Sequence, residues 1–173
     1  MPDAYAAAAS AYDLFARPYR GAQYAALARL LPHLRPDAGP ILDVGAGSGA
    51  VTAWALTELP TSIVLALEPS PAMRALLLAR VATHPEWHPR LTVRPEGFFD
   101  ATLPARIGGA IALGVMGHFD AGERAAVLAE LADRLPARGA ALIDLQHPER
   151  PQRIEPYEFT VATVGELTYR GIA

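Results

Sequence analysis

The chain alternates between two spacings of apolar residues, one typical of buried strands and the other of amphipathic helices. Short apolar runs predict strands at 41–44, 62–68, 91–96, 108–116 and 140–145. Between them, apolar residues recur at the helical spacing of three and four positions. That spacing predicts helices at 22–35 and 121–135, while the glycine run leads into a helix near 49–58 and Ser70 with Pro71 starts one that reaches residue 81. The run at 62–68 (SIVLALE) is continuous rather than alternating, as expected for a strand that is covered on both faces.

The regular succession of strand and helix predicts an α/β fold, a Rossmann-like three-layer sandwich with a mostly parallel sheet and helices on both faces. Such sheets bind ligands at the carboxyl ends of their strands. Asp43, Glu68, Glu96 and Asp144 all fall at or just after predicted strand ends. We therefore expect the functional site at this edge of the sheet.

The pattern divides the chain into three parts. Residues 1–22 form an N-terminal helical segment, residues 23–146 form the core, and residues 147–173 form a β-hairpin-like extension. In the extension, EFTVATVGELTYRG predicts an antiparallel pair of strands around Gly165. Because the chain ends shortly after this hairpin, we expect the C-terminal part of the sheet to be incomplete, through truncation or because the rest lies on another polypeptide.

Composition and charge narrow the range of functions. The 173 residues are 51% hydrophobic and 19% charged, which suits one globular domain, and their net charge is −3. An acidic chain is not expected to bind nucleic acid, which requires a basic face. The sequence contains no Lys and no Cys, which excludes P-loop and Schiff-base lysines, disulfides and thiolate ligands. No apolar run is long enough to span a membrane, and we expect a cytoplasmic location.

A glycine-rich segment, DVGAGSG, follows the first predicted strand and places Asp43 ahead of Gly45, Gly47 and Gly49. A P-loop would need a lysine, and a dinucleotide-binding turn has the spacing GxGxxG rather than the GxGxG found here. Asp43 would also repel a pyrophosphate, whereas it would attract a ligand that carries cationic groups. The segment therefore favours a phosphate-free ligand with positive charge.

This acidic residue and glycine run after an apolar strand resemble the first motif of the class I S-adenosylmethionine-dependent methyltransferases. Glu68, which lies 19 residues past Gly49, matches the acid that accepts both ribose hydroxyl groups in that family. A carboxylate suits a vicinal diol because it can accept two hydrogen bonds at once. The following PSPAM and the later LGVMGH and LPARGA also resemble family segments, and the resemblance covers about residues 10–146.

The resemblance implies S-adenosyl-L-methionine as the cofactor and a set of residues that bind it. Asp43 would meet the methionyl ammonium group, and the PSPAM segment would lie near adenine. Gly97 and Phe98 stand where the family often has Gly-Asp, so adenine is expected to stack on Phe98 or Phe99 instead. The predicted cofactor-binding residues are Tyr19, Asp43, Gly45, Ala46, Gly47, Gly49, Glu68, Pro69, Met73, Gly97, Phe98 and Leu113.

Tyr5, Tyr12 and Tyr19 recur every seven residues in the N-terminal segment, which suits one stripe of a helix. Such a stripe indicates either core packing or ligand contact. In the resembling family an N-terminal helix often closes over the cofactor as a lid. Tyr12 and Tyr19 are then the candidates for the methionyl carboxylate, with Arg17 or Arg20 as further partners.

His118 follows the fourth predicted strand, where methyltransferases place groups that face the sulfonium and the acceptor. A neutral imidazole could act as the general base, because its pKa lies near the working pH. The alternative is a solvated or helix-capping histidine, since transfer to a nucleophilic acceptor needs only orientation. The other four histidines show no ligand spacing, so no metal site is expected.

The sequence thus predicts methyl transfer from S-adenosylmethionine to an O, N or C nucleophile of a small molecule. Two alternatives stay open: a protein that binds the cofactor without transferring its methyl group, and a nicotinamide-dependent oxidoreductase. The second lacks both GxGxxG and a Tyr-xxx-Lys pair. The expected partner is a small-molecule methyl acceptor, with neither nucleic acid nor membrane, and the open sheet edge would allow a homodimer.

Overall fold

A computed structural model describes residues 3–145, 155 and 158–172. Five parallel strands form one sheet in the order β3-β2-β1-β4-β5. The strands are β1 (Ile41–Val44), β2 (Val64–Leu67), β3 (Leu91–Arg94), β4 (Gly109–Ala112) and β5 (Ala141–Ile143). The predicted α/β fold with a parallel sheet is confirmed.

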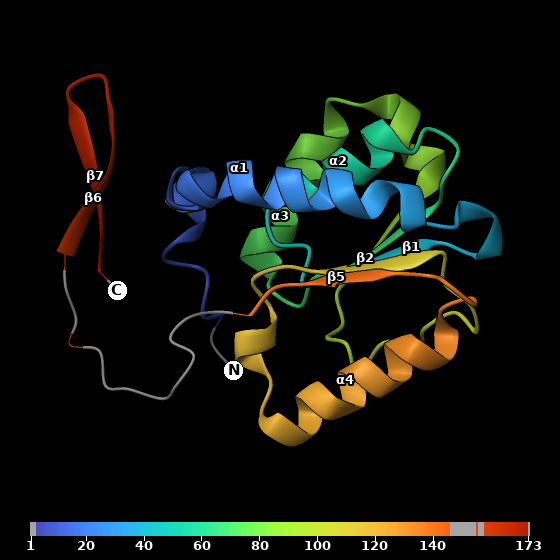
Figure 1. Cartoon of the computed structure of the whole chain (residues 1–173). Helices are drawn as coiled ribbons and strands as arrows, with labels where there is room; N and C mark the ends of the chain where they lie inside the picture. Colours follow the sequence, from blue (N-terminus) through green and yellow to red (C-terminus); the bar gives the residue numbers. More distant parts are fainter. Residues whose placement is uncertain (1–2, 146–154, 156–157, 173) are drawn as a thin grey trace.

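Helices cover both faces of the sheet (Figure 1). They are α1 (Tyr12–Leu30), α2 (Ala50–Glu58), α3 (Pro71–Ala82) and α4 (Ala121–Arg134). The first three lie on one face and α4 lies on the other. Short 3-10 turns are η1 (Ala9–Ala11), η2 (Leu31–His33), η3 (Pro36–Ala38), η4 (Pro85–Arg90) and η5 (Met116–His118). The three predicted layers are therefore present.

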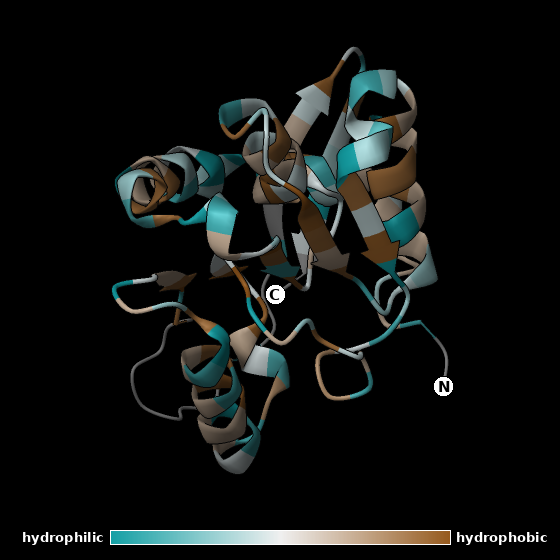
Figure 2. Ribbon diagram, turned by 90° about the vertical axis from the view of Figure 1, so that its right-hand side faces the viewer, coloured by the Kyte–Doolittle hydropathy of each residue, from teal (hydrophilic) through white to brown (hydrophobic). Residues whose placement is uncertain are grey.

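Successive residues of each strand serve opposite faces of the sheet, because side chains alternate along a strand. Ile41 packs with Leu27 and Leu77 in the cluster under α1, α2 and α3. Its neighbour Leu42 packs with Val127 in the cluster against α4. Figure 2 shows this hydrophobic layer of strands between helices of mixed polarity. Burial on both faces explains the continuous apolar runs in the sequence.

Local signals fix the helix starts near the carboxyl edge of the sheet. Ser70 caps α3, since its hydroxyl oxygen accepts a 3.1 Å hydrogen bond from the Met73 amide, and Pro71 occupies the first turn. Asp120 and Glu123 form a reciprocal capping box at the start of α4. These caps anchor the turns that follow β2 and β4.

The N-terminal region differs from the prediction. Helix α1 runs without interruption from Tyr12 to Leu30 although it contains Pro18, so it begins earlier and ends earlier than the helix predicted at 22–35. Packing of its C-terminal half in the core, where Leu27 is fully buried, holds this helix together. The strand predicted at 108–116 is shorter, because the chain turns at Gly114 into η5.

Beyond the core, β6 (Glu158–Val164) pairs with β7 (Leu167–Ile172) as an antiparallel hairpin with Gly165 in its turn. This hairpin is a sheet of its own, and the described strands do not join it to the five-stranded sheet. Residues 146–154, where the predicted extension begins, lie outside the described residues. Within the described ranges, none of the helices has the length and apolarity to cross a membrane.

Candidate functional site

A cavity of about 520 Å³ opens at the carboxyl edge of the sheet. The order of the strands reverses between β1 and β4, and ligands bind parallel sheets at such a switch point. The predicted site residues that line it are Gly45, Gly47, Glu68, Pro69, Met73, Gly97, Phe98, Leu113 and His118. A smaller cavity of about 60 Å³ shares the glycine loop, and Asp43 and Ala46 line it. The structure thus gathers most of the predicted residues around one site.

The glycine loop uses its glycines for two different purposes. Gly47 has a φ of 57°, and a Cβ atom there would find no atom closer than the Tyr12 hydroxyl oxygen at 3.7 Å. Gly49 has a φ of 80°, and its Cβ atom would lie 2.7 Å from Leu77 Cγ of α3. Gly47 therefore leaves space for a ligand, whereas Gly49 allows α2 and α3 to pack and lines neither cavity.

Glu68 follows β2 and is only 5% exposed. Its Oε2 accepts a hydrogen bond from the Gly47 amide at 2.7 Å, and its Oε1 accepts one from the Ser70 amide at 2.8 Å. Burial raises the pKa of the Glu68 carboxyl, and the two backbone amides partly oppose this. Each oxygen retains a second lone pair, so the carboxylate can still accept two hydrogen bonds from a ligand in the cavity.

Asp43 lies within β1 and is 2% exposed. Its Oδ2 accepts a 2.6 Å hydrogen bond from the Thr52 hydroxyl group. The pKa of Asp43 is raised to about 7, mainly by burial; the Thr52 hydrogen bond opposes the rise and the Glu68 charge adds to it. No basic side chain in the described part of the chain forms an ion pair with Asp43. A buried carboxylate without a counter-ion is stabilised by a cationic ligand.

Sequence reasoning missed Asp3, which lines the larger cavity from the N-terminal segment. Its Oδ2 accepts hydrogen bonds from Ser70 Oγ at 2.9 Å and from the Ala72 amide at 3.0 Å. Its Oδ1 accepts a 3.0 Å hydrogen bond from the Tyr5 amide. The Ala72 hydrogen bond is the main cause that lowers the pKa of Asp3. Asp3 therefore ties the N-terminal segment to the start of α3, beside the cavity.

The predicted helical stripe of three tyrosines is not formed, because α1 begins at Tyr12 and Tyr5 lies in a turn before it; Tyr5 and Tyr12 line the site and Tyr19 does not. Tyr12 lines both cavities, and its ring meets that of Tyr5 edge to face at 6.2 Å. Tyr19 is 68% exposed and lines neither cavity. Arg20 and Gln23, which follow Tyr19 on the same helix, do line the smaller cavity, so the site extends along this part of α1 without contacting Tyr19.

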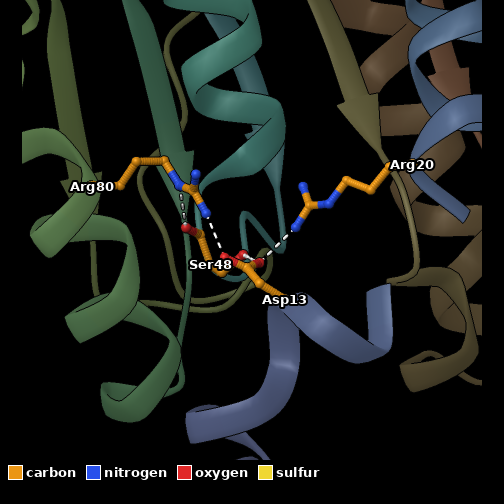
Figure 3. A network of polar contacts seen from close by, with 4 residues as sticks. All are labelled: Asp13, Arg20, Ser48 and Arg80. Atoms are coloured by element: carbon orange, nitrogen blue, oxygen red, sulfur yellow. Dashed lines mark hydrogen bonds and ion pairs between the residues drawn. The ribbon is translucent and has the colours of Figure 1, made fainter. Parts of the chain in front are cut away.

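Asp13 joins α1 to the glycine loop and to α3 (Figure 3). Its Oδ1 accepts hydrogen bonds from Ser48 Oγ and from Arg20, both at 2.6 Å. Its Oδ2 accepts one from Arg80 at 2.6 Å, and Arg80 also donates to the Ser48 carbonyl at 3.1 Å. Arg20 is thereby held on the lining of the smaller cavity.

His118 ends η5 after β4 and lines the larger cavity. Its Nε2 lies 2.6 Å from the Tyr5 hydroxyl oxygen. Asp144 stabilises the same turn, because its Oδ1 accepts a 2.7 Å hydrogen bond from the Gly114 amide. Among the described residues no group of three or more acidic or histidine side chains could hold a metal ion.

Comparison with known proteins gives a family match and a shared fold. Residues 41–139 match the protein family described as methyltransferase domain. The chain is similar in structure to the DhpI–SAH complex, with a TM-score of 0.59 and 24% identity over 79% of this chain and 63% of that chain. It is also similar to the glycopeptide N-methyltransferase MtfA complexed with S-adenosyl-L-methionine (TM-score 0.52, 26% identity, 78% of this chain, 58% of that chain).

A third similar structure is the O-methyltransferase NcsB1 from neocarzinostatin biosynthesis, with a TM-score of 0.51 and 25% identity over 62% of this chain and 32% of that chain. No curated protein sequence matches the chain. The chain spans less than two thirds of the length of each of these three proteins. The family match covers more than half of the 173 residues and includes the whole glycine loop and Glu68. The chain therefore belongs to the methyltransferase domain family.

Proposed function

We propose that this protein transfers the methyl group of S-adenosyl-L-methionine to a small-molecule nucleophile. The observation that carries the proposal is the pair of buried carboxylates, Asp43 and Glu68, on either side of an open glycine loop. A phosphate-free ligand would satisfy both carboxylates if it carried an ammonium group for Asp43 and a ribose diol for Glu68. DhpI and MtfA, which share this fold, are described as complexes with SAH and with S-adenosyl-L-methionine.

The residues of the two cavities fit the parts of this cofactor. In the smaller cavity, Asp43 would accept hydrogen bonds from the methionyl ammonium group, and Arg20 would face the carboxylate. In the larger cavity, Glu68 would accept hydrogen bonds from the ribose hydroxyl groups. Gly47, which leaves space for a ligand, would let the nucleoside lie against the loop. The cofactor, once bound, would supply an electrophilic methyl group on sulfur.

Adenine would lie in the apolar part of the larger cavity, after β3. Met73 and Phe98 are nearly fully buried and line it together with Gly97 and Pro69. Phe98 stands where the resemblance would place an acid, so stacking of adenine on the Phe98 ring would take the place of a hydrogen bond to a polar side chain. The exposed Phe99 packs edge to face on Phe98 at 5.4 Å and supports its ring.

His118 is the group proposed to receive a proton from the acceptor. It stands on the turn after β4, the strand beside β1, and faces the same cavity as Glu68. A neutral imidazole accepts a proton efficiently near neutral pH. Its placement supports an acceptor whose nucleophilic atom carries a proton, while the O, N or C identity of that atom is left to experiment.

Calorimetric titration of the full chain with S-adenosylhomocysteine tests the proposal. We expect one molecule to bind per chain, and Asp43→Asn to weaken the binding. NAD⁺ serves as the matched nucleoside control, because its pyrophosphate would stand beside two buried acids. Binding of NAD⁺ without binding of S-adenosylhomocysteine would contradict the proposal and favour an oxidoreductase.

We also propose that residues 1–22 act as a lid on the core at 23–146, with residues 147–173 as an extension. The contacts of Asp3 with α3 support the lid.

A cytoplasmic setting is proposed because the sequence contains no Cys. A homodimer is proposed because β3 and β5 are the edges of the sheet. Light scattering after size exclusion tests the dimer, which a monomer mass would contradict.

A further inference from the structure

Tyr5 and His118 meet in the wall of the larger cavity although 113 residues separate them in the sequence. The phenolic oxygen and Nε2 lie 2.6 Å apart, and the rings meet edge to face at 5.8 Å. Burial raises the pKa of the Tyr5 phenol, with smaller contributions from Tyr12 and Glu68, so the phenol is protonated at neutral pH. A protonated phenol at this distance is suited to donate its hydrogen to Nε2.

The N-terminal segment holds Tyr5 in this position. The Asp3 carboxylate accepts hydrogen bonds from the Tyr5 amide and from two groups at the start of α3. The Tyr5 ring also packs against the Tyr12 ring. On the other side, the His118 amide donates a 3.0 Å hydrogen bond to the Val115 carbonyl, which fixes the η5 turn. Both members of the pair are therefore positioned before any acceptor binds.

The surroundings of the pair indicate the kind of acceptor. Val115 and Phe119 line the cavity beside His118, and Phe119 belongs to an aromatic row with Phe99. No arginine is among the described residues that line this cavity, and the sequence contains no lysine. Its titratable lining groups are Asp3, Glu68, Tyr5, Tyr12 and His118. Among the described lining residues, a carboxylate or phosphate on the acceptor would find neither arginine nor lysine, whereas an uncharged aromatic ring would find apolar contacts.

We propose that Tyr5 and His118 together remove the proton from the phenolic hydroxyl group of an uncharged aromatic acceptor. This inference rests on the proposed methyltransferase function. The acceptor hydroxyl donates to the free lone pair of the Tyr5 oxygen, while the Tyr5 hydroxyl donates to His118 Nε2. The acceptor and Tyr5 then both carry phenolic hydroxyl groups, so the proton moves between two groups of the same chemical type.

The step is balanced in atoms and charge. The acceptor oxygen takes the methyl group, and sulfur recovers the electron pair of the broken carbon–sulfur bond. The acceptor proton passes to the Tyr5 oxygen as the Tyr5 proton passes to Nε2. The imidazole becomes an imidazolium ion and later releases its proton to water. Tyr5 ends the step as the neutral phenol it was at the start.

The tautomer of His118 tests the pair without any turnover. If Tyr5 donates to Nε2, nitrogen NMR of the ligand-free protein will show His118 protonated on Nδ1, because the hydrogen bond to one nitrogen sets the state of the other. His118→Asn identifies the signal by its loss. Tyr5→Phe should shift this signal, and the matched Tyr24→Phe in α1, outside both cavities, should not. An Nε2-protonated His118 in the wild-type protein would overturn the proposal.

Turnover gives the second test, with production of S-adenosylhomocysteine as the readout. The probes are 4-hydroxyacetophenone, which is neutral, and 4-hydroxybenzoate, which has similar size and a negative charge. We expect methylation of the neutral probe, a loss of about 10²-fold or more in kcat for Tyr5→Phe, and unchanged affinity for S-adenosylhomocysteine. The double variant Tyr5→Phe/His118→Asn should lose no more than His118→Asn alone, because the pair acts as a unit.

The two levels of proposal fail in different ways. If wild-type protein does not bind S-adenosylhomocysteine, the proposed function fails. If it binds but does not methylate the neutral probe, prefers the anionic probe, or tolerates Tyr5→Phe within about twofold, the inference about Tyr5 and His118 is overturned while the proposed function stands. Additive losses in the double variant would also overturn it, since independent residues multiply their effects.

Discussion

Replacement of Asp43 by Asn should raise the stability of the ligand-free protein against unfolding at high pH and weaken its binding of S-adenosylhomocysteine. Burial raises the folded-state pKa of Asp43 to about 7, compared with an ordinary value of 3.8. Between these two values the folded state keeps a proton that the unfolded state has lost. Stability is therefore highest below the unfolded pKa and falls as the pH rises towards the folded pKa.

The size of the effect follows from the shift. The two pKa values differ by 7 − 3.8, or about 3 units, and each unit corresponds to about 1.4 kcal/mol, so ionisation of Asp43 costs about 4 kcal/mol of stability in full. A change from roughly pH 5.5 to pH 8.5 crosses only the part of the interval between the two pKa values that lies above pH 5.5. The wild-type protein should then lose about 2 kcal/mol more than Asp43→Asn does.

Urea unfolding of both proteins at the two pH values measures this difference, and calorimetry measures the binding. A carboxylate paired with a buried ammonium contributes at least about 2 kcal/mol, so Asp43→Asn should reduce the affinity for S-adenosylhomocysteine by about 30-fold or more. Leu42→Val, a change in the same strand, would lower stability equally at both pH values. A stability difference between wild type and Asp43→Asn that does not depend on pH would refute the reasoning.

Three further changes test other parts of the site. Glu68→Gln should reduce the affinity for S-adenosylhomocysteine by about 10- to 100-fold in calorimetry. The single side-chain oxygen of Gln cannot accept hydrogen bonds from the Gly47 and Ser70 backbone N–H groups and from a ribose diol together. Unchanged affinity would contradict the assigned contact. Gly49→Ala should lower stability by about 1–3 kcal/mol in urea unfolding, since its Cβ atom would collide with Leu77. Asp13→Asn should lower the free energy of unfolding by only about 1 kcal/mol, because the Asp13 side chain is half exposed in its ion pairs with Arg20 and Arg80. It should nevertheless speed the release of S-adenosylhomocysteine in stopped-flow measurements. An unchanged release rate would argue against a lid.

The sequence was sufficient to predict the parts of the site that depend on neighbouring residues. The turn from β1 into α2 is local, so the glycine run and Asp43 could be placed before the structure was known. Glu68 could be placed because β2 is parallel to β1, and parallel neighbours end at one edge. The cap of α3 at Ser70 was equally local. Each of these inferences needed only a few residues and the rules of strand and helix ends.

The lid could not be placed in the same way. Asp3 contacts α3 across 69 residues, and no local pattern sets it apart from other acidic residues. The seven-residue spacing of the tyrosines predicts one stripe of a helix, but α1 begins at Tyr12 and Tyr5 lies before it. The spacing does not distinguish Tyr19, which lines neither cavity, from Tyr5 and Tyr12, which line the larger one. Long-range packing decided this point.

The most direct test of the account is proton release on ligand binding. At about pH 6 the buried Asp43 is mostly protonated, and it must ionise to pair with the ammonium group of S-adenosylhomocysteine. Calorimetric titrations in two buffers of different ionisation enthalpy count the protons. We predict that the wild-type protein releases close to one proton per ligand bound and that Asp43→Asn releases almost none. Equal proton release by the two proteins, or no binding by the wild type, would contradict the central claim.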